Sequence, residues 1–265
     1  MSQSEFKRAA RLLFEAHERR EPFRPLPAEL APRTAEAAYA IQDAFVALRA
    51  QKRGAIAGYK IALTSAQMRR FVGIEHPQAG ILFESTLQRT PAGVRAADYL
   101  RLIVEFELAV QMAEDLPAAD APLSREKVAN AVGAVMPALE LADDRNADYA
   151  ELARHPFELI ADNAWNEGVV LGYPLAEWRG LELASLHGRA TINGAPAGEG
   201  LGGDAMGHPF DAVAWIAEHL AAHGRGLLRG EVVITGSIIT SRTARRGDLV
   251  KFSVEGLGEV ELRVD

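Results

Sequence analysis

The chain has 265 residues, 48% of them hydrophobic and 25% charged, which is typical of a globular protein with a substantial core. Its formal net charge of −7 argues against binding to nucleic acid or to an anionic membrane, because both need a concentrated basic patch. The absence of cysteine excludes disulfides, thiolate metal ligands and a cysteine nucleophile. No stretch has the length of a membrane span or of a signal peptide's apolar core, so we expect a soluble cytoplasmic protein.

Two amphipathic helices are expected at the start of the chain. Residues 5–19 carry apolar side chains at helical spacing, and Thr34 can cap a second helix over residues 35–51. Four prolines between residues 22 and 32 mark an irregular connection between these helices. We therefore predict an N-terminal helical region that comprises residues 1–53.

From residue 54 onward the pattern changes to short β-rich runs separated by glycine and proline. Two further helices interrupt these runs, one after Ser124 and one that begins near Pro209 and ends at Gly224. Asn193-Gly194 is a strong signal for a tight turn. The expected strands are Ile56–Ala62, Gly80–Phe83, Leu102–Met112, Val132–Leu141, Gly168–Leu171, Leu181–Ile192, Glu231–Gly236, Asp248–Val254 and Glu259–Val264. Because strands and helices do not alternate regularly, we predict an α+β fold with a mixed, mostly antiparallel β-rich domain over residues 54–265.

Two patterns that suggest other chemistry lack the residues that this chemistry needs. The glycine-rich stretch Gly200–Gly207 has neither the lysine and serine of a P-loop nor the spacing of a dinucleotide fingerprint, so we expect a flexible loop or flap. His219 and His223 are spaced one helical turn apart without a third metal ligand nearby in the sequence. We expect this histidine pair at an exposed helix end.

The triplet Glu105-Phe106-Glu107 lies within an apolar run that predicts a strand. Alternation places Glu105 and Glu107 on one face, roughly 7 Å apart along the backbone. Two carboxylates on one strand face repel each other unless a cation, protons or water relieve them, and a divalent metal is one such relief. The same face also carries Arg101 and Gln111, so the triplet alone is more often explained by a solvated strand face.

Two further ionisable residues lie in apolar runs. Lys60 follows Gly58-Tyr59, and a buried, unpaired lysine favours a depressed pKa and catalytic use. A lysine whose stem lies on apolar surface while its ammonium reaches water is the commoner arrangement. Glu140 ends the sequence Pro-Ala-Leu-Glu and adds a third carboxylate in an apolar run, which by itself is more often a surface residue on an edge strand.

The order of these motifs resembles a known family. Gly-x-Lys-Ile-x-Leu-Thr-Ser is followed by Glu-x-Glu-Leu-Ala, Pro-Ala-Leu-Glu, Ala-Asp-Asn, Gly-His-Pro at a helix start and Thr-Gly-Ser. This order is similar to that of the 2-keto-4-pentenoate hydratases and 2-oxohept-4-ene-1,7-dioate hydratases. The 4-oxalocrotonate decarboxylases belong to the same group, within the fumarylacetoacetate hydrolase superfamily. The resemblance extends from Tyr39 to Val264.

The resemblance implies a fold of the fumarylacetoacetase C-terminal type, with the N-terminal helices added. It implies a Mg²⁺ (or Mn²⁺) site, a small 2-oxo acid substrate, and a homo-oligomer that can associate with a pathway partner enzyme. Lys60 matches the active-site lysine of the family. The implied metal ligands are Glu105, Glu107 and Glu140, and the implied substrate contacts are Gln78, Leu82, Asn163 and Ser237.

Three departures from the family pattern bear on the reaction. Hydratases tend to carry an acidic residue in a Pro-Asp-x-Gly stretch, where this chain has Gln78, whose amide cannot act as a general base. Leu102-Ile103 replaces a Pro-Arg or Pro-Lys pair, and Ala62 replaces a glycine. We predict a metal-dependent lyase acting on a 2-oxo or 2-hydroxydienoic acid in aromatic catabolism, in the first place a hydratase. A 4-oxalocrotonate-type decarboxylase and an inactive homologue that serves as a partner subunit remain the alternatives.

Overall fold

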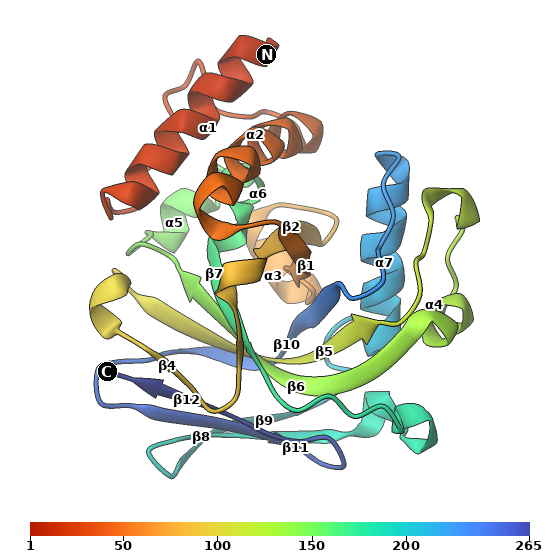
Figure 1. Cartoon of the computed structure of the whole chain (residues 1–265). Helices are drawn as coiled ribbons and strands as arrows, with labels where there is room; N and C mark the ends of the chain where they lie inside the picture. The colour runs from red at the N-terminus through yellow and green to blue at the C-terminus, as the bar shows by residue number, and fades with distance from the viewer.

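The computed structural model describes all 265 residues and confirms the α+β class (Figure 1). The helices are α1 (Gln3–Glu18), α2 (Ala35–Arg53), α3 (Ala66–Val72), α4 (Arg125–Ala131), α5 (Tyr149–Leu152), α6 (Glu158–Ala161) and α7 (Pro209–Ala222). The first six strands are β1 (Ile56–Ala62), β2 (Gln78–Phe83), β3 (Leu87–Arg89), β4 (Ala92–Val94), β5 (Leu102–Met112) and β6 (Val132–Asp143). The remaining strands are β7 (Asn166–Leu171), β8 (His187–Ile192), β9 (Ala195–Leu201), β10 (Val232–Thr243), β11 (Leu249–Val254) and β12 (Gly258–Val264).

The strands form two sheets that pack face to face. The larger sheet has seven strands in the order β2-β1-β10-β5-β6-β7-β3, and the smaller has five in the order β4-β12-β11-β8-β9. Figure 1 shows the smaller sheet beneath the larger one and the two N-terminal helices above it. The larger sheet is curled, since its edge strand β2 lies against β7, near the other edge. This curvature gives the larger sheet a concave inner face.

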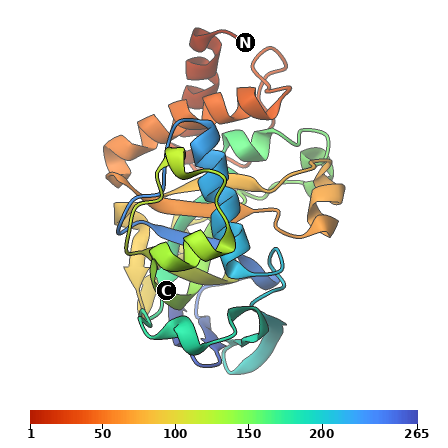
Figure 2. The same ribbon diagram turned by 90° about the vertical axis from the view of Figure 1, so that its right-hand side faces the viewer.

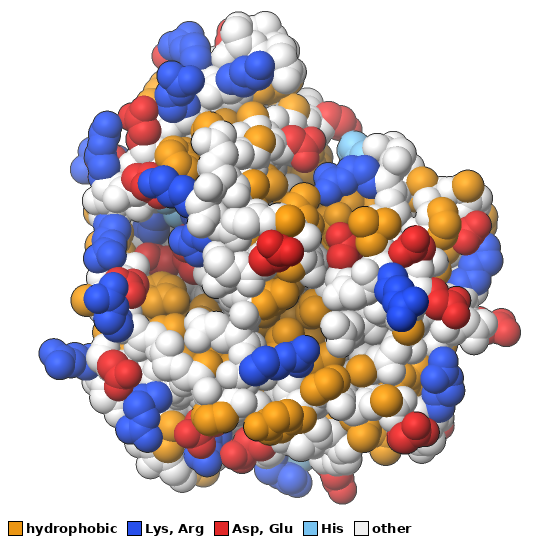
Figure 3. Space-filling view, viewed as in Figure 1, with side chains coloured by type: hydrophobic (Ala, Val, Ile, Leu, Met, Phe, Trp, Pro, Cys, Tyr) orange, Lys and Arg blue, Asp and Glu red, His pale blue; other side chains and the backbone are white.

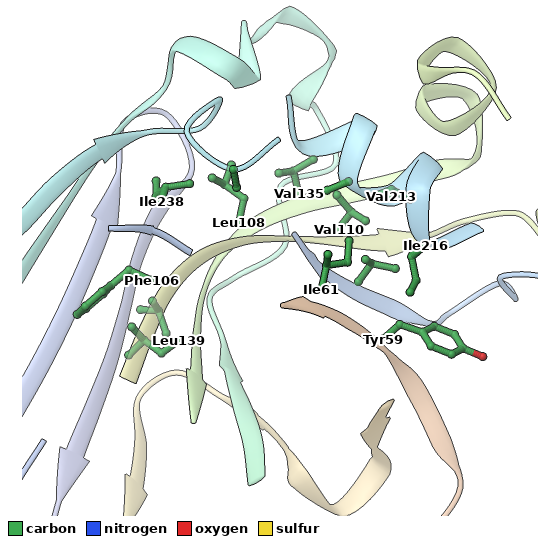
Figure 4. Close-up of a cluster of buried hydrophobic side chains, with 14 of the residues drawn as sticks. Tyr59, Ile61, Phe106, Leu108, Val110, Val135, Leu139, Val213, Ile216 and Ile238 are labelled. Carbon is green, nitrogen blue, oxygen red and sulfur yellow. The ribbon is translucent and has the colours of Figure 1, made fainter. Parts of the chain in front are cut away.

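Alternation along β5 decides which side chains enter the core between the sheets. Phe106 and Leu108 belong to the largest apolar cluster, together with Leu139 of β6 and Phe252 of β11 (Figure 4). The rings of Phe106 and Phe252 meet edge to face, with centroids 5.6 Å apart, a favoured aromatic geometry. The glutamates on either side of Phe106 consequently face the inside of the curled sheet.

The helices cover the larger sheet on different sides. Val213 and Ile216 of α7 pack in the same cluster as Tyr59 and Ile61 of β1 (Figure 4), and Figure 2 shows α7 along the side of the molecule, below α2. Helices α1 and α2 form a second apolar cluster with α6. Helix α1 begins at a capping box in which Ser2 and Glu5 satisfy each other's backbone N–H groups. The division at residue 53 stays a prediction.

Several sequence-based expectations were wrong in detail. The expected strand Leu181–Ile192 begins only at His187, because residues Leu183–Ser185 form a short 3-10 helix. In this helix the Ser185 N–H donates to the Glu182 carbonyl. Strand β9 was not expected, since its Ala, Pro and Gly content is untypical of strands; the Asn193-Gly194 turn pairs it with β8. At the end of α7, His223 is exposed as expected, whereas His219 is only partly exposed and stacks on Trp215.

Two surface properties bear on the expected partners. Acidic and basic side chains are interspersed on the face shown in Figure 3. None of the seven helices combines the length and the apolar character that a membrane crossing requires.

Truncation of Phe252 to alanine should lower the free energy of unfolding by about 3–5 kcal/mol, because the ring is fully buried and its loss leaves a cavity between the sheets. Urea denaturation would show a lower midpoint with an unchanged slope. The exposed turn residue Glu255 provides the control, since Glu255→Ala should change stability by no more than about 0.5 kcal/mol. Equal effects of the two substitutions would contradict the assigned core.

Candidate active site

Three glutamates meet on the inner face of the curled sheet. Glu105 and Glu107 lie on β5 and Glu140 on β6, and Glu105 is the direct cross-strand partner of Glu140. Each glutamate offers one carboxylate oxygen such that all three oxygens lie within 4.8 Å of one another. Glu107 and Glu140 are fully buried, and β6 is an inner strand of the sheet, so the explanation of Glu140 as an edge-strand surface residue is wrong.

The glutamates are only partly satisfied by protein donors. The backbone N–H of Gly236 donates to Glu107 Oε2 at 2.6 Å, and Asn166 Nδ2 donates to Glu140 Oε1 at 2.9 Å. Glu107 Oε1 and Glu140 Oε2 are buried without a hydrogen-bond partner. Buried polar atoms are normally paired, so these two oxygens are available to coordinate a cation.

Burial and mutual repulsion make the triad unfavourable as three bare carboxylates. Burial, followed by repulsion from Glu140, raises the pKa of Glu105 to about 7. Burial, followed by repulsion from Glu140 and Glu105, raises the pKa of Glu107 well above its usual value. A hard divalent cation relieves both effects, and carboxylate oxygens are the ligands that Mg²⁺ prefers. The donor set therefore fits a divalent metal ion.

Lys60 of β1 completes the charged group. It is buried, and its Nζ lies 3.0 Å from Glu140 Oε1. Burial lowers the pKa of Lys60, but attraction by Glu140, Glu105 and Glu107 outweighs burial and raises the pKa above its usual value. The expectation of a depressed pKa was wrong, because the sequence did not place the three carboxylates around the ammonium group.

Gly80 makes room for the stem of Lys60. The two residues are cross-strand partners in the antiparallel pair β1 and β2. A Cβ on Gly80 would lie 2.7 Å from Lys60 Cγ and 2.8 Å from Lys60 Cδ, closer than real contacts of this kind. Any larger residue at this position must therefore displace the lysine or the strand.

Two of the expected substrate contacts share the face of Gly80 on β2. Gln78, the partner of Ala62, is fully buried, and neither Oε1 nor Nε2 of its amide has a hydrogen-bond partner. Leu82 is also fully buried, within an apolar cluster that includes Ala138 and Val169. Gln78 thus offers a free amide two residues along the strand from Gly80, whereas Leu82 offers only apolar surface.

The other two expected contacts have their polar atoms engaged by the protein. The amide of Asn163 accepts the N–H of Ile81 at 2.7 Å and donates to the Ile81 carbonyl at 3.0 Å. The hydroxyl of Ser237 accepts the N–H of Phe106 at 3.0 Å and lies 2.7 Å from the Ile239 carbonyl. The substrate-binding roles of Asn163 and Ser237 stay predictions.

Sequence reasoning missed two groups that hold the triad in place. Asn166 lies 26 residues from Glu140 in the chain, and Gly236 N–H lies 129 residues from Glu107. Gly236 has a φ of 100°, a conformation that favours glycine, and it is the middle residue of the Thr-Gly-Ser motif. That motif was a usable signal for Gly236, whereas nothing in the sequence distinguishes Asn166 from other asparagines.

Comparison with known proteins gives a family match over most of the chain. The family described as fumarylacetoacetate (FAA) hydrolase C-terminal matches residues 49–265. The sequence is 31% identical over 253 residues to a 2-hydroxyhexa-2,4-dienoate hydratase of Comamonas testosteroni, covering 95% of this chain and 94% of the relative. It is also 31% identical over 257 residues to a 2-oxo-hept-4-ene-1,7-dioate hydratase of Escherichia coli, covering 96% of each chain.

Solved structures with a similar fold include 4-oxalocrotonate decarboxylase from Pseudomonas putida G7 in complex with magnesium and adipate. The TM-score is 0.91 at 24% identity, covering 100% of this chain and 99% of the other. The same enzyme in complex with calcium and acetate has a TM-score of 0.90 at 25% identity, with the same coverage.

Glu107→Gln should abolish metal binding without unfolding the protein, because the substitution removes one ligand and one repelling charge. Wild-type protein should gain about 2.7 kcal/mol of stability at a metal concentration of 100 times Kd. For a chain of this size, this gain raises the melting temperature by roughly 5–11 °C. Differential scanning calorimetry with Mg²⁺ or Mn²⁺ should show no such rise for Glu107→Gln. The exposed Glu114→Gln is the control, and a variant at position 107 that still responds to metal would refute the ligand set.

Gly80→Ala should reduce turnover by about 100-fold or more while metal binding persists, since the new methyl group displaces Lys60 and not the glutamates. Gly93→Ala on β4 is a matched control, because a Cβ there meets nothing closer than 3.7 Å. Steady-state kinetics and metal titration on both variants separate the two effects. Full activity of Gly80→Ala would show that the position of Lys60 is not critical.

Proposed function

Because the chain belongs to the fumarylacetoacetate (FAA) hydrolase C-terminal family, we propose that it is a metal-dependent lyase acting on a 2-oxo or 2-hydroxydienoic acid in aromatic catabolism, in the first place a hydratase. The observation that carries this proposal is the buried triad with two unpartnered carboxylate oxygens beside Lys60. The curated relatives quoted above, which match almost end to end, are both hydratases.

Glu105, Glu107 and Glu140 would hold Mg²⁺ (or Mn²⁺). When bound, such an ion supplies positive charge against the enolate oxygen of a 2-oxo acid, a contribution of several kcal/mol to the transition state. Glu107, Glu140 and Lys60 are buried, and burial strengthens the charge interactions among them.

The ammonium of Lys60 holds charge or moves protons in the proposed site. It is a charged donor close to Glu140, so it can hold the negative charge of the substrate or deliver a proton. In the hydratase reaction, the proton of the 2-hydroxyl group leaves and carbon C5 of the dienoate gains one, which gives a 3,4-unsaturated ketone. Water then adds its hydroxyl to C4 and its remaining proton to C3.

Gln78 favours decarboxylation as the second candidate reaction. Its amide is buried without a partner on the face that carries Lys60, but it does not titrate and cannot remove a proton from water. Loss of CO₂ needs no general base, because the electrons of the broken C–C bond pass into the enolate. In a hydratase, the amide of Gln78 would orient the water and another group would accept its proton.

Ile103 leaves the inactive homologue as a weaker alternative. Ile103 packs against an apolar cluster that contains Ala142 and Trp165, where the family pattern has a basic residue. The loss of this charge fits an altered substrate tail, and it also fits lost activity. The retained triad and its ion pair with Lys60 speak against lost activity.

We also propose that the protein acts in the cytoplasm as a homo-oligomer, alone or with a pathway partner enzyme. Its cysteine-free sequence suits a reducing compartment. Sedimentation analysis of the purified protein, with and without a candidate partner, distinguishes these states.

The reaction is tested by incubation with 2-hydroxypenta-2,4-dienoate and with 4-oxalocrotonate in the presence of Mg²⁺ or Mn²⁺. Formation of a 4-hydroxy-2-oxo acid identifies a hydratase, and release of CO₂ identifies a decarboxylase. Gln78→Leu should reduce kcat/KM by about 10-fold on the true substrate, the value of one lost hydrogen bond. Metal-loaded protein that converts neither compound would contradict both candidate reactions.

A further inference from the structure

A buried ion cluster lies at the contact between helix α1 and the larger sheet. His17, near the end of α1, has a side chain that is only 8% exposed. Its Nε2 lies 2.6 Å from Asp162 Oδ1, and its Nδ1 lies 3.1 Å from Glu167 Oε1. One imidazole ring therefore joins two carboxylates that are close in sequence to each other and 145 or more residues from the histidine.

Three arginines complete the cluster. Arg145 pairs with Asp162, while Arg49 and Arg53 of α2 pair with Glu167 at 2.8 and 2.6 Å. Burial lowers the pKa of His17, but Asp162 outweighs burial and raises it above the usual value. Arg49 Nη1 also lies 2.9 Å from His17 Nδ1. The ring is thus tied at both nitrogens: Nε2–H donates to Asp162, and Nδ1 either donates to Glu167 or accepts from Arg49, itself paired with Glu167.

The two carboxylates bracket a strained segment. Between them, Asn163, Ala164 and Trp165 have φ values of 53°, 46° and 59°, a left-handed conformation that residues other than glycine rarely adopt in succession. Such strain persists only where the surroundings over-determine the backbone. The ion pairs at Asp162 and Glu167 are the fixed points at the two ends of this turn.

The same segment touches both halves of the proposed active site. Asn163 hydrogen-bonds to both backbone groups of Ile81, as a neighbouring strand would, next to Gly80 and its partner Lys60. This contact helps to close the curled sheet between β2 and β7. Three residues further on, Asn166 donates to Glu140. The turn therefore sets the position of the lysine strand and of a metal-triad glutamate together.

His17 itself stands outside the site. It lines a cleft of about 690 Å³ with Arg49, Arg53, Arg145 and Glu167, and none of the three triad glutamates or Lys60 lines this cleft. Both ring nitrogens are engaged within the cluster. A role for His17 in the site must therefore be exerted through the segment 162–167.

We infer that His17 is a positioning residue: by joining Asp162 to Glu167 it fixes the turn that places Asn163 against β2 and Asn166 against Glu140. Helix α1 therefore contributes to the geometry of the site through His17, in addition to packing on α2. The effect on turnover rests on the proposed function, whereas the effect on the turn itself does not.

The test compares His17→Phe, which keeps the ring volume and removes both polar links, with Leu13→Ala one turn earlier on α1. Leu13 is buried in the helix–helix cluster and forms none of the polar links of His17, so its truncation removes apolar packing of α1 and leaves those links in place. Three quantities are measured on full-length protein: amide hydrogen exchange of residues 78–83, the Kd of Mn²⁺, and kcat and KM separately.

For His17→Phe we expect amide exchange of Ile81 to become about 10 times faster and the Kd of Mn²⁺ to rise about 10-fold. We expect kcat to fall more than KM changes. For Leu13→Ala we expect all of these to stay within about twofold of the wild-type values. If His17→Phe does not fold, His17→Leu, which also removes both polar links, is judged by the same criteria.

Equal responses of the two variants, or an unchanged exchange rate of Ile81 in the position-17 variant, would overturn the inference. Hydrogen exchange needs neither metal nor substrate, so the inference and the proposed function fail separately. Wild-type protein that turns over no substrate would contradict only the proposed function.

Discussion

The arrangement of this protein depends on three carboxylates that share one buried face. Glu107 and Glu140 are buried and Glu105 is partly exposed. Burial and repulsion from neighbouring carboxylates disfavour the charged forms of Glu105 and Glu107. The ammonium group of Lys60 pairs with Glu140, and Asn166 and the backbone N–H of Gly236 donate hydrogen bonds to Glu140 and Glu107. Two carboxylate oxygens of the triad have no hydrogen-bond partner. This donor set, near the centre of the larger sheet, fits a divalent cation.

The same two strands that hold the carboxylates also hold the core. Along β5 and β6, Phe106 and Leu139 face the smaller sheet, while the glutamates beside them face inward. A slip of one residue in this pairing would move charges into the core and aromatic rings into the site. The large penalty for that slip fixes the register, and the register fixes the distance between the carboxylates. Core packing is therefore the source of the geometry of the site.

In the proposed function, the metal site and the residue that bears on the choice of reaction lie in different parts of the fold. A metal ion held by the triad would supply the electron sink, which serves the proposed hydration and the alternative decarboxylation equally. The residue that can separate these reactions is Gln78, which lies farther along β2 and offers a neutral amide. His17 links the N-terminal helix α1 to the turn that contacts both β2 and Glu140, so residues outside the site also influence its geometry.

The sequence by itself determined the features that depend on neighbours along the chain. Strand alternation put Glu105 and Glu107 on one face, and motif order pointed to Lys60 and Glu140 as candidates, which the structure brings together with them. Tertiary structure decided the charge state of Lys60, the burial of Gln78 and the role of His17, because each depends on groups brought from other elements. The physical reason is distance along the chain: periodicity reports which way a side chain points, but only the folded sheet determines which charges it meets.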